Sequence, residues 1–241
     1  MKAESTVSGE FDQYAGEYDE MLEQGLAVSG EGKEFFAQRR IDWLKACMGQ
    51  LRVAPRRIMD YGCGTGIAAP LLLDRFDAES VIGVDPSSRL IERANRDYGS
   101  PRTKFEEVLR YVPQEAMELV YCNGVFHHIP MSEREIAARY IWRSLQPDGY
   151  LAFWENNPWN PGTRYVMSRT PFDRDAVTLR AAEACLLLQS EGFHVMRTDY
   201  LFVFPRSLSV FRWMEPHLSP FPFGAQYLVL ARKSGRLSKS S

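Results

Sequence analysis

The sequence predicts an α/β protein with a doubly wound, mostly parallel sheet, and three observations point to that fold class. Apolar segments of strand length alternate with amphipathic segments of helix length along most of the 241 residues. The segment IMDYGCGTG at 58–66 has the pattern of a buried strand followed by three glycines at alternate positions. A second apolar segment at 80–84 ends in Asp85, about twenty residues further on, the spacing at which a βαβ unit places an acidic residue near a glycine turn.

The first half of the chain predicts helices and strands in alternation. Apolar residues recur at helical spacing from Lys33 to Met48, and Ser87 or Ser88 is suited to cap a helix. Gly99 is expected to end that helix in a left-handed conformation. In chain order the expected elements are a helix at 33–48, a strand from 58, a helix at 68–76, a strand at 80–84, a helix from 87 or 88 to about 98, and a strand at 103–108.

The second half predicts two more strands of this sheet and a β-rich end. Ser132 and Glu135 have the spacing of a capping box at the start of a helix. A Pro-Asp-Gly turn at 147–149 separates this helix from the next strand. The expected elements are a strand at 118–122, a helix from 132 to about 145, a strand at 150–155, a helix at 180–190, and β-rich segments at 192–204 and 226–232.

Composition and charge narrow the range of functions. The chain is 45% hydrophobic and 25% charged, which suits one compact domain. A net charge of -2 and a pI near 6.1 give no overall attraction to nucleic acid or to an anionic membrane, so neither is an expected partner. The four cysteines form no C-x-x-C pair, and no apolar run reaches the roughly eighteen residues of a membrane span. We therefore expect a soluble protein with reduced thiols in the cytoplasm.

The glycine turn distinguishes between nucleoside cofactors. Its glycines run G-x-G-x-G instead of G-x-G-x-x-G, and Asp60 lies at the strand end just before them. A carboxylate there would repel the pyrophosphate of a dinucleotide. It would attract S-adenosylmethionine, which has no phosphates and carries a cationic amino group and a sulfonium.

Four segments extend this interpretation to most of the chain. They are IMDYGCGTG, VIGVDPS, LVYCNGVFHHIP and SLQPDGYLAFWE. In their order and spacing, the chain resembles the class I S-adenosylmethionine-dependent methyltransferases, roughly over residues 11–233. The resemblance implies a Rossmann-like sheet of seven strands with helices on both faces and an antiparallel last strand. It also implies S-adenosyl-L-methionine as cofactor and S-adenosyl-L-homocysteine as product.

The expected organisation is a single domain at 11–233 between a flexible N-terminus at 1–10 and a flexible tail at 234–241. Insertions at 156–176 and 206–223 are too long for plain connections, and we interpret both as lids over the acceptor. The alternative is that they form satellite cores, or that the second makes a dimer contact. A monomer and a homodimer are both compatible with the sequence.

Residues at the motif positions are the candidate cofactor contacts. The segment at 11–22 resembles the family segment that closes over the methionine end of the cofactor, although its two tyrosines could instead only pack a helix onto the domain. Arg40 is a candidate for the cofactor carboxylate, with a solvated surface position as the alternative. The family's Gly-Asp pair after the third strand is missing, so Glu106 and Glu107 are alternatives there, Glu107 being the candidate we retain. The full set is Tyr14, Tyr18, Arg40, Asp60, Gly62, Cys63, Gly64, Gly66, Asp85, Pro86, Glu107, Asn123 and Gly124.

The candidate catalytic residues follow the fourth and fifth strands. His127 could remove a proton from a hydroxyl acceptor, because an imidazole titrates near neutral pH, or it could only pack or cap the loop. Glu155 is the competing base. An acceptor that is already ionised, such as a carboxylate, needs no base, and positioning would then supply most of the rate. The candidate substrate-pocket residues are His128, Trp159, Arg164, Phe211 and Trp213, with Arg169 as the alternative to Arg164 for holding an anionic acceptor.

These observations favour methyl transfer to an oxygen of a small molecule, either a hydroxyl or a carboxylate. An N-methyltransferase of the same fold and a catalytically inactive S-adenosylmethionine-binding partner or sensor are the alternatives. The Y-x-x-x-K pair of short-chain dehydrogenases, the G-x-x-x-x-G-K-[ST] motif of nucleotide hydrolases and the Pro-Pro motif of base-modifying enzymes do not occur at the required positions. No spacing of histidine, cysteine and carboxylate residues suggests a metal site.

Overall fold

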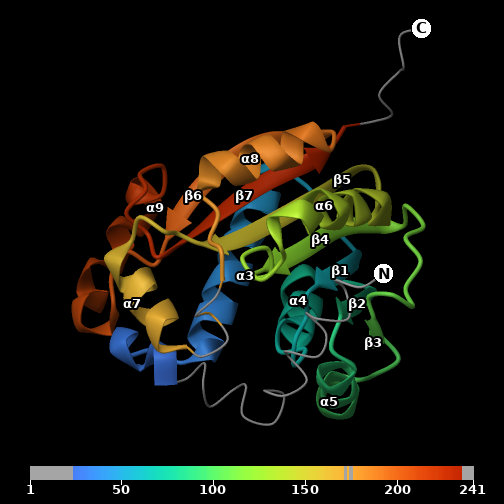
Figure 1. Cartoon of the computed structure of the whole chain (residues 1–241), viewed down its shortest axis with the longest axis horizontal. Coiled ribbons are helices and arrows are strands. Elements are labelled where there is room, and N and C mark those ends of the chain that lie inside the picture. Colours follow the sequence, from blue (N-terminus) through green and yellow to red (C-terminus); the bar gives the residue numbers. More distant parts are fainter. Residues whose placement is uncertain (1–23, 171–172, 174–175, 235–241) are drawn as a thin grey trace, which may run out of the picture.

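The computed structural model describes residues 24–170, 173 and 176–234, which form an α/β fold around one seven-stranded sheet (Figure 1). The strands are β1 (Arg57–Tyr61), β2 (Ser80–Asp85), β3 (Thr103–Glu107), β4 (Met117–Asn123), β5 (Leu145–Asn156), β6 (Phe193–Leu201) and β7 (Gln226–Lys233). Their order is β3-β2-β1-β4-β5-β7-β6, with β7 antiparallel to both of its neighbours and the other strands parallel to one another. The predicted fold class, with its antiparallel last strand, is confirmed.

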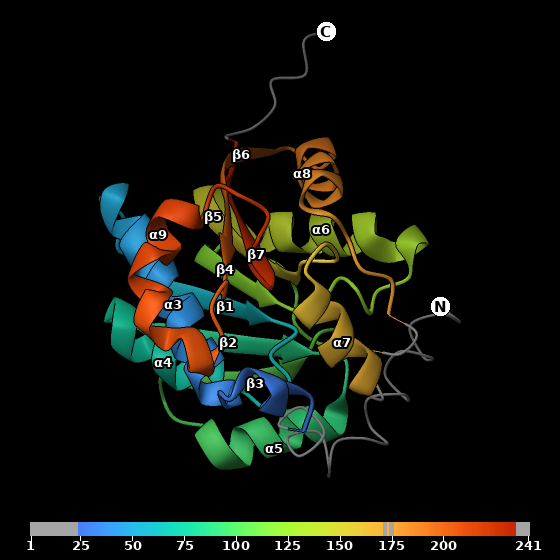
Figure 2. The same ribbon diagram turned by 90° about the vertical axis from the view of Figure 1, so that its left-hand side faces the viewer.

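Helices cover both faces of the sheet. The α-helices are α3 (Lys33–Gln50), α4 (Ala68–Phe76), α5 (Ser88–Tyr98), α6 (Arg134–Ser144), α7 (Pro161–Arg169), α8 (Ala181–Ser190) and α9 (Glu215–Leu218), and the 3₁₀ segments are η1 (Ala27–Ser29), η2 (Met131–Glu133) and η4 (Arg206–Met214). Figure 2 shows α3 and α4 on one side of the sheet and α6 and α8 on the other. Two buried clusters result: Leu44 and Leu72 belong to the first, and Ile141 and Leu188 belong to the second.

The strands carry apolar side chains on both faces because both faces are buried. Successive side chains of a strand point to opposite faces, which fixes where the polar residues at the strand ends lie. Asp60 in β1 and Asn123 in β4 belong to the face covered by α3 and α4, whereas Glu155 in β5 belongs to the face covered by α6 and α8. All three lie near the carboxyl ends of parallel strands, the edge where open α/β sheets bind ligands.

The start of α6 differs from the predicted capping box. Ser132 and Glu135 do not form one, because η2 comes first, α6 begins at Arg134, and no side chain caps its first turn. Arg134 is buried, its Nε donates to the carbonyl of Ile129 at 3.0 Å, and its Nη2 donates to the carbonyl of Val177, which lies 43 residues further on. Tertiary contacts of this arginine, which the local pattern does not reveal, therefore help to define where the helix starts.

The two ends of α5 give one confirmed prediction and one wrong one. The hydroxyl of Ser87 caps the helix by accepting from the amide of Leu90 at 3.2 Å. Gly99 ends the helix in an extended conformation, with φ -62° and ψ 135°, and not in the expected left-handed one. The chain passes almost directly into the tight turn before β3, and this turn requires an extended residue there.

The two insertions fold into short helices. The insertion at 156–176 contains α7, whose first turn is capped by the side chain of Asn160. The insertion at 206–223 contains η4 and α9 and lies beside the first half of α3, where Glu215 forms an ion pair with Arg39 at 3.3 Å. Their predicted action as lids stays a prediction.

Some predictions fall on residues outside the described ranges. These are the flexible N-terminus at 1–10, nearly all of the tail at 234–241, and the cofactor contacts Tyr14 and Tyr18. They stay predictions. Among the helices of the described ranges, none is both long enough and apolar enough to cross a membrane.

Candidate functional site

The turn after β1 forms a tight loop at the carboxyl edge of the sheet. Gly62 has a φ of +72°, and a Cβ built there would lie 2.3 Å from a Val125 methyl carbon, so the fold requires glycine. The amides of Gly62 and Cys63 both donate to the carbonyl of Val84, at 2.8 and 3.1 Å, which ties the loop to β2. The Cys63 side chain packs in the core, so its predicted cofactor contact would come from its backbone.

Open space lies directly over the next glycine of this loop. A Cβ built on Gly64, whose φ is +52°, would meet no atom within 4 Å. A Cβ on Gly66, by contrast, would lie 2.9 Å from the ring of Phe105. Glycine is therefore needed at positions 62 and 66 because the neighbouring side chains leave no space for a Cβ atom. Gly64, in contrast, leaves room for a ligand to approach the backbone.

Asp85, at the end of β2, forms hydrogen bonds that hold the glycine loop in place. Its Oδ2 accepts from the amide of Gly64 and its Oδ1 from the amide of Ser87, both at 2.9 Å. Pro86 is the residue between Asp85 and Ser87 in the chain. The register places Glu107, at the end of β3, beside Asp85. These strand ends thus lie at the edge where the sequence predicts the adenosine part of a cofactor, and their contacts with ribose and adenine stay predictions.

Asp60 and Asn123 present two buried oxygen atoms, Asp60 Oδ2 and Asn123 Oδ1, that have no hydrogen-bond partner among the described residues. Asp60 is 3% exposed. Burial first and the charge of Asp85 second raise the pKa of Asp60 to about 7, against the lowering effect of Arg40. Buried acceptors without donors are unfavourable, so this pair suits a cationic group supplied by a ligand.

Arg40 provides a buried cation beside this acidic group. Its Nε donates to the hydroxyl of Tyr121 at 3.1 Å, and its Nη1 donates to the side-chain oxygen of Gln226 at 2.8 Å. The solvated position considered from the sequence is therefore wrong. A carboxylate and a guanidinium near one strand end match the two charges of an amino-acid zwitterion, such as the methionine part of the expected cofactor.

His127 lies between two carboxylates just beyond the end of β4, in the loop that Gly124 opens with a φ of +67°. Its Nδ1 is 2.7 Å from Oε2 of Glu155, and its Nε2 is 3.3 Å from Oδ1 of Asp173. Glu155 is 1% exposed and also accepts from the amide of Phe126 at 2.7 Å. Burial alone would lower the pKa of His127, but the two carboxylates outweigh this effect and raise the pKa to about 10.

This arrangement supports neither of the two predicted bases. At neutral pH, His127 carries a proton on both ring nitrogens and has no lone pair with which to remove a proton. Glu155 has both oxygens engaged, since Oε2 also accepts from the amide of Asn156 at 3.2 Å. His128 packs against His127 with ring centres 4.0 Å apart, and burial followed by the charge of His127 lowers the pKa of His128 well below its usual range.

Sequence reasoning missed Asp173. It is 46 residues from His127 along the chain, and only the fold of the insertion at 156–176 brings the two together. The one available signal was an acidic residue inside an insertion that follows the strand next to the histidine pair.

The residues predicted to line the acceptor pocket do not gather around a common pocket in the described part of the chain. Trp159 is 67% exposed and has the guanidinium of Arg180 5.2 Å from its ring centre. Trp213 is 71% exposed in η4, and Phe211 and Arg164 are also exposed. Of these residues, His128 lies beside His127, and its contact with an acceptor stays a prediction. The structure therefore does not support an apolar pocket built from these aromatic rings.

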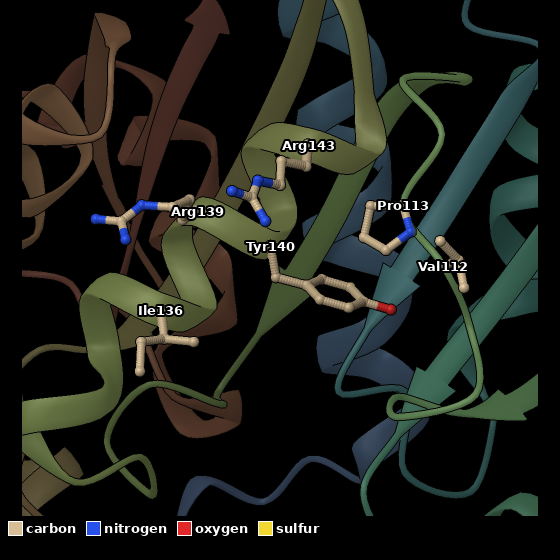
Figure 3. A pocket seen from close by; sticks show the side chains of 6 residues that line it. All are labelled: Val112, Pro113, Ile136, Arg139, Tyr140 and Arg143. Atoms are coloured by element: carbon tan, nitrogen blue, oxygen red, sulfur yellow. The ribbon is translucent and has the colours of Figure 1, made fainter.

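A surface pocket of about 350 Å³ lies against α6, away from these residues (Figure 3). Its lining residues are Val112, Pro113, Ile136, Arg139, Tyr140 and Arg143. Figure 3 shows the Tyr140 ring directed from the helix toward the loop that carries Val112 and Pro113. None of the candidate site residues lines this pocket.

The sheet, the glycine loop and the unpartnered acidic strand end define an α/β protein that binds a positively charged nucleoside cofactor. A family model described as a methyltransferase domain matches residues 59–153. The chain is also 38% identical over 208 residues to a trans-aconitate 2-methyltransferase of Rhodopseudomonas palustris strain HaA2, covering 77% of this chain and 79% of that relative. The chain belongs to the class I S-adenosylmethionine-dependent methyltransferases, and S-adenosylmethionine is its cofactor.

Other relatives agree with this assignment. The chain is 26% identical over 189 residues to a trans-aconitate 2-methyltransferase of Acidovorax sp. strain JS42, covering 70% of this chain and 72% of the relative. A crystal structure of a methyltransferase from Thermotoga maritima, described as a possible histamine N-methyltransferase, aligns with a TM-score of 0.65. That alignment covers 95% of this chain and all of the other at 19% identity, so it supports the fold alone.

We expect Gly64→Ala to weaken cofactor binding with only a small loss of stability. The added methyl group would occupy the open space over the loop, while the positive φ costs an alanine about 1 to 2 kcal/mol. Gly62→Ala is the matched control, because its methyl group would clash with Val125 and destabilise the fold itself. Calorimetric titration of S-adenosylhomocysteine and urea unfolding separate the two effects. Unchanged affinity in a folded Gly64→Ala variant would mean that the cofactor does not approach this loop.

Proposed function

We propose that this enzyme transfers the methyl group of S-adenosylmethionine to a carboxylate oxygen of a small molecule, forming a methyl ester. The observation that carries the proposal is the closed network around Glu155, which leaves neither Glu155 nor His127 free to act as a base. A carboxylate is ionised at neutral pH and attacks a sulfonium methyl group without losing a proton. A hydroxyl acceptor would require a base to remove its proton, and neither His127 nor Glu155 is free to serve as that base.

The names of the relatives support a carboxylate acceptor, and two arginines of the neighbouring insertion are candidate partners for it. The relatives from Rhodopseudomonas palustris and Acidovorax are named for trans-aconitate, a polycarboxylate. The helix α7, in the insertion that follows β5, carries Arg164 and Arg169 as candidate partners of such an anion. Arg169 lies 5.1 Å from the ring centre of Tyr165, a contact that leaves its charge on the surface of this insertion.

In this proposal the chain holds the cofactor through groups at one sheet edge. Asp60 and Asn123 accept hydrogen bonds from its amino group, and Arg40 pairs with its carboxylate. Asp85 contacts the ribose beside the glycine loop, with Glu107 toward the adenine. The bound cofactor supplies an electrophilic methyl group. The protein contributes position, since in-line attack and exclusion of water account for most of the rate of such a transfer.

The test is incubation with S-adenosylmethionine and a panel of small mono-, di- and tricarboxylic acids, with chromatographic measurement of S-adenosylhomocysteine. We expect turnover that requires a carboxylic acid and gives a product that mild base hydrolyses to methanol. Activity confined to hydroxyl or amine acceptors of the same shape would contradict the proposal. Cofactor binding without turnover on any acceptor would favour the inactive binding protein.

The remaining expectations from the sequence stay predictions. They are a monomeric or homodimeric state, a cytoplasmic location, and independence of nucleic acids and membranes.

A further inference from the structure

Three side chains with metal-ligating atoms meet near the carboxyl ends of β4 and β5. His127, His128 and Asp173 each offer one such atom, and these atoms all lie within 4.8 Å of one another. Oδ1 of Asp173 is 3.3 Å from Nε2 of His127 and 3.3 Å from Nε2 of His128. Two imidazole rings therefore direct the same kind of nitrogen atom to one carboxylate oxygen. Methyl transfer to a carboxylate does not by itself require such a group.

The two distances from Asp173 fit tetrahedral coordination. A tetrahedral ion with bonds of about 2.0 to 2.1 Å to nitrogen and oxygen holds its ligand atoms about 3.3 Å apart. An octahedral ion with the same bonds would hold neighbouring ligands closer, at about 2.9 Å. Both separations from Oδ1 of Asp173 match the tetrahedral value, and the ring nitrogens of the two histidines lie within 4.8 Å of each other.

Glu155 orients the first histidine in the way that metal sites require. Its Oε2 accepts from Nδ1 of His127 at 2.7 Å, which leaves Nε2 as the ligand atom directed at Asp173. Metal-bound histidines commonly donate their other ring N–H to a carboxylate in this manner. The amide of Phe126, at 2.7 Å from Oε1, holds Glu155 in place.

Access and charge also suit a cation. The side chains of His128 and Asp173 are 14% and 9% exposed, while that of His127 is 3% exposed, so the cluster is mostly buried, with His128 the most exposed member. Three protein ligands leave a fourth tetrahedral position for water or another oxygen. The carboxylate of Glu155 faces the cluster, Asp173 adds a second negative charge within it, and the guanidinium of Arg134 is a nearby cation that donates to the carbonyl of Ile129.

We propose that His127, His128 and Asp173 bind a divalent transition-metal ion such as Zn²⁺, with Glu155 as the residue that positions His127. The ion replaces the proton on Nε2 of His127, which passes to the solvent. The open position binds one oxygen of the acceptor and offsets part of its negative charge. This last role rests on the proposed function, whereas metal binding itself does not.

The test uses the full chain freed of metal by chelation and titrated with Co²⁺, a spectroscopic substitute for Zn²⁺. We expect one ion per chain, visible absorption bands of tetrahedral intensity, and displacement by Zn²⁺. Asp173→Asn and His128→Gln should each weaken binding by about tenfold or more. His194→Gln is the matched control, because it removes an exposed histidine of β6 and should leave binding unchanged. Thermal unfolding of the metal-free variants verifies that each one folds.

Two outcomes would overturn the site. One is the absence of Co²⁺ and Zn²⁺ binding to the wild-type chain at micromolar metal, which would make the cluster a hydrogen-bonded network around a protonated His127. The other is an equal loss of binding in His194→Gln and Asp173→Asn. Methyl transfer is measured separately on metal-free enzyme. Full esterification of a carboxylate without metal would remove the ion's role toward the acceptor and leave the proposed function in place.

Discussion

Asp60→Asn is expected to weaken the affinity for S-adenosylhomocysteine by about 10² to 10³-fold, because it removes the buried charge that faces the amino group of the cofactor. The unpartnered oxygen of Asp60 is the atom that this amino group would satisfy. The same change should stabilise the cofactor-free protein by about 1 to 3 kcal/mol near pH 8, since burial disfavours the ionised carboxylate. Calorimetric titration measures the affinity, and urea unfolding measures the stability.

Asp199→Asn is the matched control for this prediction. Asp199 is also a buried aspartate, but its carboxylate is fully partnered, accepting from Nε1 of Trp43 at 3.0 Å and from Nη2 of Arg197 at 2.9 Å. Its substitution should destabilise the protein and leave the cofactor affinity of the folded chain unchanged. A loss of stability in Asp60→Asn, or an affinity close to that of wild type, would contradict the role given to Asp60.

The pKa of about 7 at Asp60 also sets a pH dependence. Between the ordinary value of 3.8 and about 7, the folded protein retains a proton at Asp60 that the unfolded chain has lost. The contribution of this group to stability therefore falls as pH rises through that window. Cofactor affinity changes in the opposite direction and rises toward pH 7, and Asp60→Asn should remove both trends. The charged groups around Asp60 are Asp85 and Arg40. Three further titratable side chains nearby are buried, and burial raises the pKa of each: Tyr121, Cys63 and Cys122.

Glu155→Ala is expected to destabilise the protein by about 3 to 5 kcal/mol, because it leaves a buried cationic imidazole and buried amides without their acceptor. Glu155 accepts from Nδ1 of His127 at 2.7 Å and from the amides of Phe126 at 2.7 Å and Asn156 at 3.2 Å. It also attracts the buried guanidinium of Arg134. Urea unfolding measures the change.

Glu118→Ala is the matched control for Glu155→Ala, because it removes a carboxylate that has similar partners but lies at the surface. Glu118 accepts from the amide of Arg56 at 2.8 Å and from Nε of Arg57 at 3.2 Å, and its side chain is 24% exposed. Water replaces these contacts, so its loss should be within about 1 kcal/mol of wild type. A loss of stability in Glu155→Ala no larger than that in Glu118→Ala would contradict the stabilising role given to the hydrogen bonds of Glu155.

The arrangement of the sheet could be predicted because its signals are local. The apolar segments, the glycine turn and the acidic residues at strand ends lie within short stretches, and parallel strands bring those ends to one edge. For this reason Asp60, Asp85 and Asn123 are at one edge of the sheet in both the prediction and the structure. The left-handed conformation of Gly99 and the capping box at the start of α6 were predicted wrongly, although α5 ends at Tyr98 as expected.

The acceptor side could not be predicted in the same way. The pairing of His127 with Asp173 depends on how the insertion at 156–176 folds, and no periodic pattern encodes that contact. Apolar composition suggested that Trp159 and Trp213 line a pocket, but composition does not reveal which side chains of a surface turn or a short helix face water. The protonation of His127 likewise depends on two carboxylates that are distant in the sequence.

A crystal structure of the complex with S-adenosylhomocysteine tests most directly how the chain holds its cofactor. We expect the amino group of the cofactor within hydrogen-bond distance of Asp60 Oδ2 and Asn123 Oδ1, its carboxylate at Arg40, and its ribose beside Asp85 over Gly64. A cofactor bound elsewhere, or one whose amino group leaves Asp60 Oδ2 without a partner, would contradict this arrangement.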